Sequence, residues 1–303
     1  MNFTKVQGAG NDFTLIETNG LDRDWSRVAI TMCDRHFGIG SDGLLLLVPS
    51  AVADFGMRIF NPDGSEAGTC GNGLRCLARY VVDTGLAGVE AKEISIEVLA
   101  GIKRIKLHYE GDEVDRQSHR GVTRLARIEV AMGEPKFEAR DIPVAIEPGS
   151  GNSVDISPFL NYPLTVDRMK LLLSLISTGN PHAVYFWDHP VSTFPLSQIG
   201  PKVERHKIFP EGVNFEVVRV ISRQEIEARV WEKGVGETLA CGSGACAIAV
   251  AARLQGYIDS KVDIKLPGGI LGVEWDGEGE VFLSGLAEII FTGEWPNEPV
   301  KTG

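Results

Sequence analysis

The stretch Trp231-Glu-Lys-Gly-Val-Gly-Glu-Thr-Leu-Ala-Cys-Gly-Ser-Gly-Ala-Cys246 combines the end of a strand, a glycine-rich turn and the start of a helix of small residues. The run 228–231 is typical of a strand, and the Ala/Val/Ile run after the stretch is typical of a buried helix. Cys241 therefore lies at a helix N-terminus, where unpaired backbone N–H groups favour negative charge. We expect this thiol to ionise more readily than a free cysteine, beside N–H groups of residues 242–244 that are open to a carboxylate.

The same arrangement occurs a second time in residues 60–76, which read Phe-Asn-Pro-Asp-Gly-Ser-Glu-Ala-Gly-Thr-Cys-Gly-Asn-Gly-Leu-Arg-Cys. Cys70 begins a Cys-Gly-Asn-Gly segment that matches the Cys-Gly-Ser-Gly segment at Cys241. A glutamate stands four residues before each cysteine, Glu66 and Glu237, and we expect each to bond N–H groups of its loop. One such cysteine is most simply a small buried residue at a helix start. Two matched loops indicate a functional pair.

Two further landmarks repeat in the same order. Gly-Asn occurs at 10–11 and at 179–180, where the asparagine stands 59 and 61 residues before the corresponding cysteine. Gly-Ser-Asp at 40–42 corresponds to Gly-Val-Asn at 212–214, and each precedes a strand-like run. Matched landmarks at nearly equal spacing indicate an internal duplication. Two halves related by a pseudo-twofold axis would bring the two cysteines face to face across a cleft.

Composition limits the classes of partner. The chain has 303 residues, enough for two domains that each bury a core, with 43% hydrophobic and 23% charged residues. A net charge of −11 argues against nucleic acid or an anionic membrane surface as partner. The N-terminus has no apolar signal region and no run is long enough to span a membrane. Five cysteines, an odd number, favour reduced thiols in a cytoplasmic protein.

The order of predicted elements favours an α+β fold. Helices are expected at 24–36, from Cys70 to 83 and from Cys241 to 254, and strands at 3–8, 11–18, 44–48, 55–60, 94–98, 102–109, 126–132, 171–176, 183–186, 215–220, 228–231, 262–266, 270–275, 281–283 and 288–291. Residues 110–124 read as a junction and 148–163 as a surface excursion. We expect two pseudo-symmetric domains, each a curved, mostly antiparallel sheet wrapped around a central helix, with the active site in the cleft between them. Their limits are 1–122, joined by the C-terminal strand 286–303, and 123–285.

Several chemistries fit poorly. The spacings Cys-x₅-Cys and Cys-x₄-Cys are not those of a zinc site, and no Cys-x-x-Cys is present for thiol exchange. A cysteine hydrolase needs one thiol and one histidine base, which leaves the duplication unexplained. No Gly-Lys-Ser/Thr follows the glycine loops, so they are not phosphate loops.

Two thiols on opposite sides of one carbon suit two-base racemisation. A thiolate removes a proton from one face while a thiol delivers a proton to the other. The α-hydrogen of an amino acid is very weakly acidic, so the growing charge on its carboxylate must be stabilised. Two helix N-termini aimed at that carboxylate offer such stabilisation, and no pyridoxal phosphate or other cofactor is required.

The sequence resembles the diaminopimelate epimerases, a pyridoxal-phosphate-independent family of lysine and cell-wall precursor synthesis. The resemblance covers most of the chain and rests on these segments: Gly8-Ala-Gly-Asn-Asp-Phe13, His36-Phe-Gly-Ile-Gly40, Asn61-x-Asp-Gly-Ser65, Cys70-Gly-Asn-Gly-x-Arg75, Gly179-Asn-Pro-His182, Glu211-Gly-Val-Asn214 and Gly234-x-Gly-Glu-Thr-x-x-Cys-Gly-Ser-Gly244. It implies a cytoplasmic homodimeric isomerase that acts on the small molecule diaminopimelate and needs neither metal nor cofactor.

The resemblance also implies the roles of individual residues. Cys70 and Cys241 would be the acid/base pair, with His182 and Glu232 helping to set thiol protonation. Substrate would be held by Asn11, Gly43, Asn61, Asn180 and Asn214, by the backbone N–H groups of Gly71, Asn72, Gly242 and Ser243, and by Glu232 and Lys233 at its distal end.

One departure from the family concerns the distal end of the substrate. Lys233 stands where family members usually carry Arg; it keeps the charge but loses the bidentate fork. A related racemase acting on another amino acid is therefore the main alternative, and a non-catalytic amino-acid-binding protein is a second. Simpler structural roles also exist: Asn11 and Asn180 as turn caps, His182 as a turn histidine, and Arg75 as half of an ion pair.

Overall fold

The computed structural model describes residues 1–88, 91–109, 125–145 and 159–296. Packing divides the chain into two compact units, Met1–Val130 with Ser284–Gly303, and Ala131–Leu283, and each is described by itself. The predicted junction, 110–124, lies outside the described residues. The domain limits read from the repeat, 122/123 and 285/286, stay a prediction.

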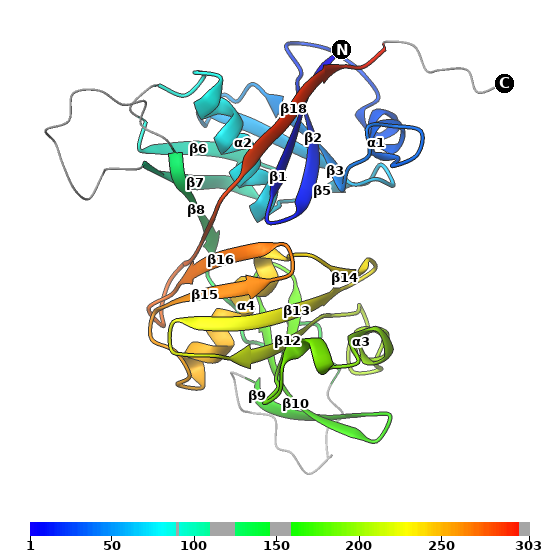
Figure 1. Cartoon of the computed structure of the whole chain (residues 1–303), viewed down its shortest axis with the longest axis vertical. Helices are drawn as coiled ribbons and strands as arrows, with labels where there is room; N and C mark the ends of the chain where they lie inside the picture. Colours follow the sequence, from blue (N-terminus) through cyan, green and yellow to red (C-terminus); the bar gives the residue numbers. More distant parts are fainter. Residues whose placement is uncertain (89–90, 110–124, 146–158, 297–303) are drawn as a thin grey trace, which may run out of the picture. The chain divides into compact units, whose positions relative to one another are not determined.

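The first unit is a mixed sheet with two helices (Figure 1). Its strands are β1 (Asn2–Gly8), β2 (Asn11–Glu17), β3 (Gly43–Val48), β4 (Phe55–Phe60), β5 (Glu66–Ala67), β6 (Glu93–Val98), β7 (Gly101–Tyr109), most of β8 (Leu125–Gly133) and β18 (Glu288–Glu294). They pair in the order β18–β1–β2–β3–β4–β6–β7–β8, with β5 beside β4. Only β2–β3 and β4–β6 are parallel among these pairings.

The second unit repeats this pattern. Its strands are β9 (Phe159–Val166), β10 (Met169–Ser177), β11 (Pro181–Phe186), β12 (Asn214–Val220), β13 (Glu225–Glu232), β14 (Gly236–Thr238), β15 (Lys261–Leu266), β16 (Gly269–Glu274) and most of β17 (Val281–Gly285). The order β9–β10–β11–β12–β13–β15–β16 has the same sequence of antiparallel and parallel pairings as β18 to β7. The short β14 lies beside β13, as β5 lies beside β4. The predicted α+β class, with curved and mostly antiparallel sheets, is confirmed.

Helices cover both faces of each sheet. On β3, Leu44 and Leu46 pack with α1 (Trp25–Cys33) in one cluster, while Leu45 approaches α2 (Gly71–Asp83) on the other face. This alternation follows from the two-residue period of a strand. Because both faces are covered, the strand is an unbroken apolar run, Gly-Leu-Leu-Leu-Leu-Val. In the second unit the central helix is α4 (Gly242–Leu254), whose Ala-rich sequence lets it pack closely on the sheet.

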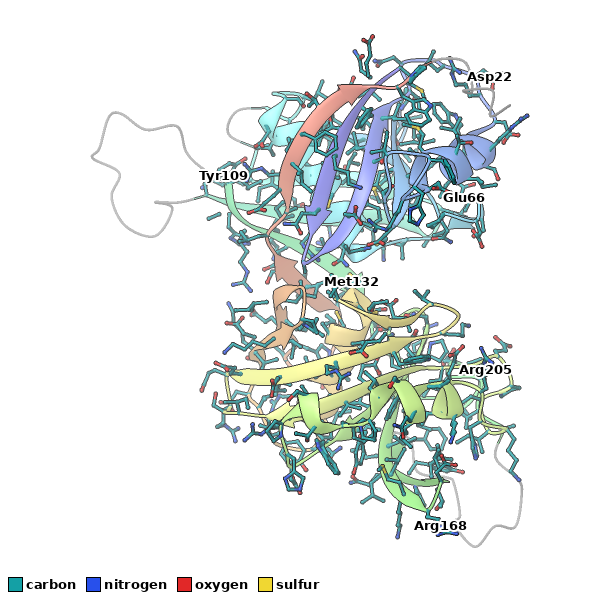
Figure 2. All side chains as sticks on the ribbon, turned by 45° about the vertical axis from the view of Figure 1, so that its right-hand side comes forward. Asp22, Glu66, Tyr109, Met132, Arg168 and Arg205 are labelled. Carbon is teal, nitrogen blue, oxygen red and sulfur yellow. The ribbon has the colours of Figure 1, made fainter. Side chains whose placement is uncertain are left out.

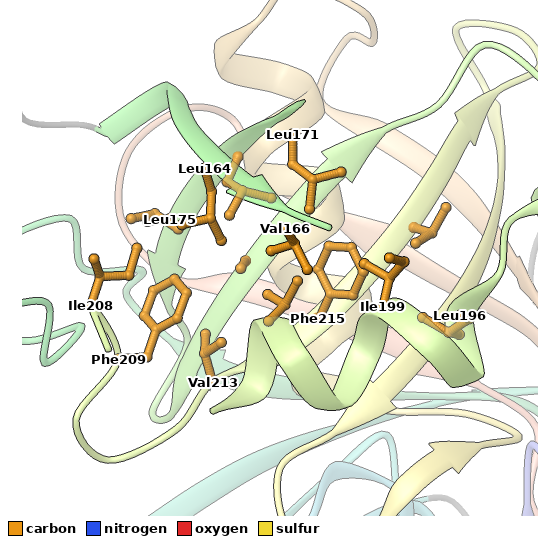
Figure 3. Packing of buried hydrophobic residues seen from close by; sticks show 14 of the residues in the cluster. Leu164, Val166, Leu171, Leu175, Leu196, Ile199, Ile208, Phe209, Val213 and Phe215 are labelled. Carbon is orange, nitrogen blue, oxygen red and sulfur yellow. The ribbon is translucent and has the colours of Figure 1, made fainter. Parts of the chain in front are cut away.

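The helix α3 (Leu196–Glu204) was not predicted. Gly200 and Pro201 interrupt its sequence and hide the apolar spacing of Leu196, Ile199 and Val203. These three side chains pack with Phe215 and neighbouring strand residues in one apolar cluster of the second unit (Figure 3). Gly200 allows the approach of Trp231, because a Cβ at Gly200 would lie 2.6 Å from the indole ring.

The predicted surface excursion at 148–163 is wrong in its last part. Phe159–Pro163 belongs to β9, where Pro163 pairs with Leu172 of β10 and Phe159 is buried. Apolar burial of Phe159 and Leu164 outweighs the turn-forming residues around them. Residues 148–158 lie outside the described residues. Within the described ranges, none of the helices is long and apolar enough to cross a bilayer.

Candidate active site

Both cysteine loops have the predicted position. Cys70 is the N-cap of α2 and Cys241 is the N-cap of α4, each with extended backbone dihedrals. Each sulfur accepts a hydrogen bond from the third helical N–H, that of Gly73 or Gly244, with an N–Sγ distance of 3.4 Å in both loops. The first two N–H groups of a helix have no acceptor within the helix. Each loop therefore presents a thiol beside backbone donors that suit an anion.

In the first unit a chain of amides positions the loop. Asn11 donates from Nδ2 to Asp42 Oδ2 at 2.8 Å and accepts at Oδ1 from Asn72 Nδ2 at 3.1 Å. The buried guanidinium of Arg75 donates from Nη2 to Asn72 Oδ1 at 2.7 Å. Cys70 Sγ lies 4.0 Å from Asn11 Oδ1. Asn11 and Asn72 are thus brought together with Cys70, and Arg75 holds the side chain of Asn72 in the same loop.

In the second unit Cys241 is surrounded by acidic groups. Its Sγ lies 3.4 Å from Ser243 Oγ, and Glu232 also hydrogen bonds to the thiol. Burial, followed by the negative charge of Glu232, raises the pKa of the Cys241 thiol well above its usual value, and Glu216 adds to this effect. The prediction that this thiol ionises more readily is therefore wrong for Cys241. The helix N-terminus was visible in the local sequence, whereas the burial and the two carboxylates come from the tertiary fold.

Burial and neighbouring groups act on the pKa of the Glu232 carboxyl. Thr238 donates from Oγ1 to Glu232 Oε1 at 2.5 Å. Burial raises the pKa of the Glu232 carboxyl, while the hydrogen bond from Thr238 and the charge of His182 act in the opposite direction. Burial is thus the largest cause of the raised pKa of both Glu232 and Cys241.

His182 lies on β11 with both ring nitrogens engaged. Its Nδ1 is 2.6 Å from Glu216 Oε1 on β12, and its Nε2 is 3.0 Å from Oδ1 of the exposed Asn180. Thr178 ties the same turn to α4, because its Oγ1 donates to the Ser243 carbonyl at 3.0 Å. The structure thus connects His182, Asn180 and the cysteine loop within one unit.

The turn after β13 is anchored from two sides. The buried Asn214 accepts at Oδ1 from the Lys233 N–H at 2.9 Å and donates to the Pro181 carbonyl at 3.0 Å. Glu204, at the end of α3, accepts from Trp231 Nε1 at 2.7 Å and from the Gly234 N–H at 3.0 Å. Lys233 itself is exposed, and its stem passes over Gly212, where a Cβ would lie 2.8 Å from Lys233 Cδ. The anchors therefore fix the backbone that carries Glu232 and Lys233.

Other predicted site residues of the first unit lie at strand ends. Asn61 follows β4 and is exposed, with its Nδ2 donating to Ser65 Oγ at 2.9 Å. Gly43 opens β3, where a Cβ would lie 3.0 Å from the Phe60 carbonyl oxygen. Asn61 thus contacts its own turn, and Gly43 lies against the end of β4.

The paired glutamates have a different role from the one predicted. Glu66, labelled in Figure 2, accepts two hydrogen bonds from Arg58 at 2.7 and 2.9 Å, and Glu237 accepts two from Arg229 at 2.8 and 3.0 Å. Each arginine precedes its partner by eight residues on the adjacent strand. The prediction that they bond loop N–H groups is wrong, because a forked guanidinium in the neighbouring strand matches a carboxylate better.

Two functional candidates were missed by the sequence reasoning: Glu204 and Glu216. Glu216 had a detectable signal, since it is a charged residue inside the apolar strand run Phe-Glu-Val-Val. Glu204 had none, because the helix that carries it was not predicted. Among the described residues, no group of three or more His, Cys, Asp or Glu side chains could hold a metal ion.

Comparison with known proteins decides the family. The family model described as diaminopimelate epimerase matches residues 3–136 and 174–290. The diaminopimelate epimerase of Moorella thermoacetica is 44% identical over 299 residues, covering 98% of this chain and 99% of that protein. That of Methanococcus maripaludis is 40% identical over 296 residues, covering 97% and 99%. The chain belongs to the diaminopimelate epimerase family. The resemblance inferred from the motifs is confirmed.

Solved structures show how widely the fold of the diaminopimelate epimerase family is shared. A phenazine biosynthesis protein of the PhzF family from Bacillus anthracis has a TM-score of 0.67 at 18% identity, covering 98% of this chain and 99% of that one. A probable proline racemase from Agrobacterium radiobacter K84 has a TM-score of 0.67 at 14% identity, covering 99% and 94%. At these identities the likeness concerns the two-unit α+β fold alone.

Proposed function

We propose that the chain is a diaminopimelate epimerase that interconverts LL- and meso-2,6-diaminopimelate. Family membership over nearly the whole length supports the reaction and the isomerase class. The observation that carries the mechanism is the repeated loop, in which a thiol caps a helix beside open N–H donors in each unit. A racemase of another amino acid is less favoured, because relatives at 40–44% identity are diaminopimelate epimerases.

The proposed reaction is a two-base proton transfer. The thiolate of one cysteine takes the α-hydrogen, so that a C–H bond breaks and an S–H bond forms. The thiol of the other cysteine gives its proton to the opposite face of the same carbon. The electron pair left on the carbon spreads into the substrate carboxylate, where N–H groups of Gly71, Asn72, Gly242 and Ser243 stabilise it. No cofactor takes part in this step.

The two thiols start from different states in this proposal. Cys241 rests as the thiol, because burial and Glu232 raise its pKa. It is therefore the proton donor for the isomer whose α-hydrogen faces Cys70, and Cys70 is the base. The reverse isomer requires the proton arrangement left at the end of the first reaction. His182 and Glu232 help to return the protons to their starting places.

The remaining predicted residues are proposed to bind the two ends of the substrate. Asn11, Gly43, Asn61, Asn180 and Asn214 surround its polar groups, Glu232 pairs with the distal ammonium and Lys233 with the distal carboxylate. For Asn214 the support is indirect, since its amide is engaged with Lys233 and Pro181. For Lys233 the support is its exposed ammonium on an anchored turn.

We also propose a cytoplasmic homodimer that serves lysine and peptidoglycan precursor synthesis. Two cysteines that must act as thiols fit a reducing compartment. The half-exposed Ile290 and Phe291 on β18 offer apolar surface for a second copy. Sedimentation of the purified protein reads the oligomeric state, and a monomer would overturn the dimer.

The test of function uses both diaminopimelate isomers beside a panel of other amino acids, including proline. Turnover of LL- and meso-diaminopimelate, with the other amino acids unchanged, is the expected result. Turnover of a monocarboxylic amino acid at a comparable rate would transfer the assignment to the alternative racemase. Oxidation adds a test of geometry: sulfurs that reach one carbon can form a disulfide after modest closure, so peptide mapping is expected to find Cys70 joined to Cys241.

A further inference from the structure

The second sheet contains a buried pair of ionisable side chains on the face that carries α4. His182 on β11 and Glu216 on β12 both have fully buried side chains, and Nδ1 lies 2.6 Å from Oε1. Glu216 comes very close to the first turn of α4, since a Cβ at Gly244 would stand 2.9 Å from Glu216 Oε1. Removing two ionisable groups from water costs free energy, so the presence of this buried pair requires a reason beyond packing.

The first sheet has no such pair at the equivalent places. His182 pairs with Asn214 as Phe13 pairs with Gly43, and the next inward positions are Glu216 and Leu45. Leu45 meets the equivalent helix glycine, where a Cβ at Gly73 would lie 3.1 Å from Leu45 Cδ2. The first unit therefore forms the same sheet with apolar residues at these places, which means that the His182–Glu216 pair is not needed to form the sheet.

Both ring nitrogens of His182 face acceptor oxygens. An ionised carboxylate only accepts hydrogen bonds, so Nδ1 of His182 must carry a proton toward Glu216. The other nitrogen, Nε2, lies 3.0 Å from Oδ1 of the exposed Asn180 and donates to it, because an amide oxygen only accepts hydrogen bonds. Nδ1 is thus the ring nitrogen that Glu216 holds, and Nε2 is the ring nitrogen beside the exposed Asn180. Other ionisable groups that interact with this cluster are Glu232 from β13 and Cys241 from the start of α4.

The carboxylate of Glu216 is committed to this one partner. Within the described part of the chain, its Oε2 is buried without a hydrogen-bond partner. A group kept for stability alone would be expected to satisfy both oxygens, because an unpaired buried oxygen costs stability. Its single strong bond runs to His182.

We propose that Glu216 is a positioning residue that holds a proton on Nδ1 of His182 and directs Nε2 toward Asn180. The inference rests on the proposed function, in which His182 helps to set thiol protonation. Glu216 does not touch substrate and acts only through the ring. Without its negative charge, the proton is no longer held on Nδ1, and the ring can exchange tautomers and lose its orientation toward Asn180.

The test is Glu216→Gln in the full-length protein, with two readouts. Histidine side chains labelled with ¹⁵N report which ring nitrogen of His182 carries the proton, and His182→Gln identifies its signals. Wild type is expected to show a protonated Nδ1, and Glu216→Gln to show a mixture of tautomers. For epimerisation we expect kcat to fall by about 10²-fold or more with KM changed only a few-fold, since general acid–base groups contribute about 10²–10⁴-fold.

Two further variants complete the design. Glu232→Gln is the matched control: it lowers kcat but leaves the His182 ring signals as in wild type. Glu216→Leu copies Leu45 of the first unit and is expected to fold, with the Nδ1 proton no longer fixed. A protonated Nδ1 and an unchanged kcat in both Glu216 variants would overturn the inference while leaving the function intact. Wild type that lacks epimerase activity but shows the Nδ1 proton would overturn the function alone.

Discussion

Gly244→Ala tests how closely the Glu216 carboxylate lies under the second cysteine loop. A Cβ at Gly244 would stand 2.9 Å from Glu216 Oε1 and 3.4 Å from Cys241 Sγ. Replacing glycine by alanine inside a helix gains about 0.5–1 kcal/mol, whereas overpacking a close-packed site costs about 1–3 kcal/mol. The net loss in the free energy of unfolding is therefore about 0–2.5 kcal/mol. The carboxylate cannot withdraw easily, because it is bonded to His182.

Gly73→Ala is the matched variant in the other unit. Its Cβ would lie 3.1 Å from Leu45 Cδ2, the end of a flexible apolar side chain that can shift by a few tenths of an ångström. We expect Gly244→Ala to lose at least about 1 kcal/mol more than Gly73→Ala, because only an apolar methyl must move in the second case. Calorimetry measures this difference as about 2–4 °C in Tm per kcal/mol for a unit of this size.

A double-mutant cycle isolates the contact between Gly244 and Glu216. If the clash is with the carboxylate, Gly244→Ala costs less in a Glu216→Ala background than in wild type, and the coupling is measurable. Equal costs in both backgrounds would mean that the new methyl meets another neighbour, with Cys241 the nearest. A Gly73→Ala variant that loses as much stability as Gly244→Ala would also contradict the proposed asymmetry.

Three further predictions concern the second unit. Lys233→Met is expected to raise KM for diaminopimelate strongly and Lys233→Arg to lower it. Both should change kcat little, because the distal end of the substrate is held alike in ground and transition states. Steady-state kinetics measures both constants, and an unchanged KM in Lys233→Met would contradict the distal role of Lys233. Alkylation of Cys241 by iodoacetamide, followed by peptide mass spectrometry, is expected only at higher pH than for an ordinary cysteine. Glu232→Gln should move the pH at which alkylation begins to a lower value, because it removes a negative charge that raises the thiol pKa. A move to higher pH would contradict this cause. Glu204→Ala frees the indole N–H of Trp231 and the Gly234 N–H, so we expect an increased KM and a changed tryptophan fluorescence. Glu225→Ala, which removes a half-buried glutamate paired with Lys265, serves as control.

Most of the fold could be predicted because its information is local. The apolar run at 44–47 can only be a strand covered on both faces, and the Cys-Gly-x-Gly segments begin helices as glycine and small residues allow. The helix α3 could not be predicted, since Gly200 and Pro201 are poor helix formers and the close approach of Trp231 to Gly200 is a tertiary contact. Its existence is a tertiary effect.

The candidate site divides in the same way. Each thiol and the helix N-terminus beside it lie in consecutive residues, so their matched positions could be found from the repeat. The protonation of Cys241 could not, because Glu232 and Glu216 reach it from other strands. A charged residue inside an apolar strand, as at Glu216, is a local sign that a neighbouring strand supplies a buried hydrogen-bond partner.

Deuterium incorporation from solvent tests the two-thiol mechanism most directly. Each diaminopimelate isomer is incubated in D₂O with wild type, Cys70→Ala and Cys241→Ala, and deuterium at the α-carbon is followed in substrate and product at early times. Two bases on opposite faces predict one deuterium in each new product molecule, none in the remaining substrate, and no epimerisation by either variant. Deuterium that builds up equally in substrate and product, or full turnover by either alanine variant, would contradict the account.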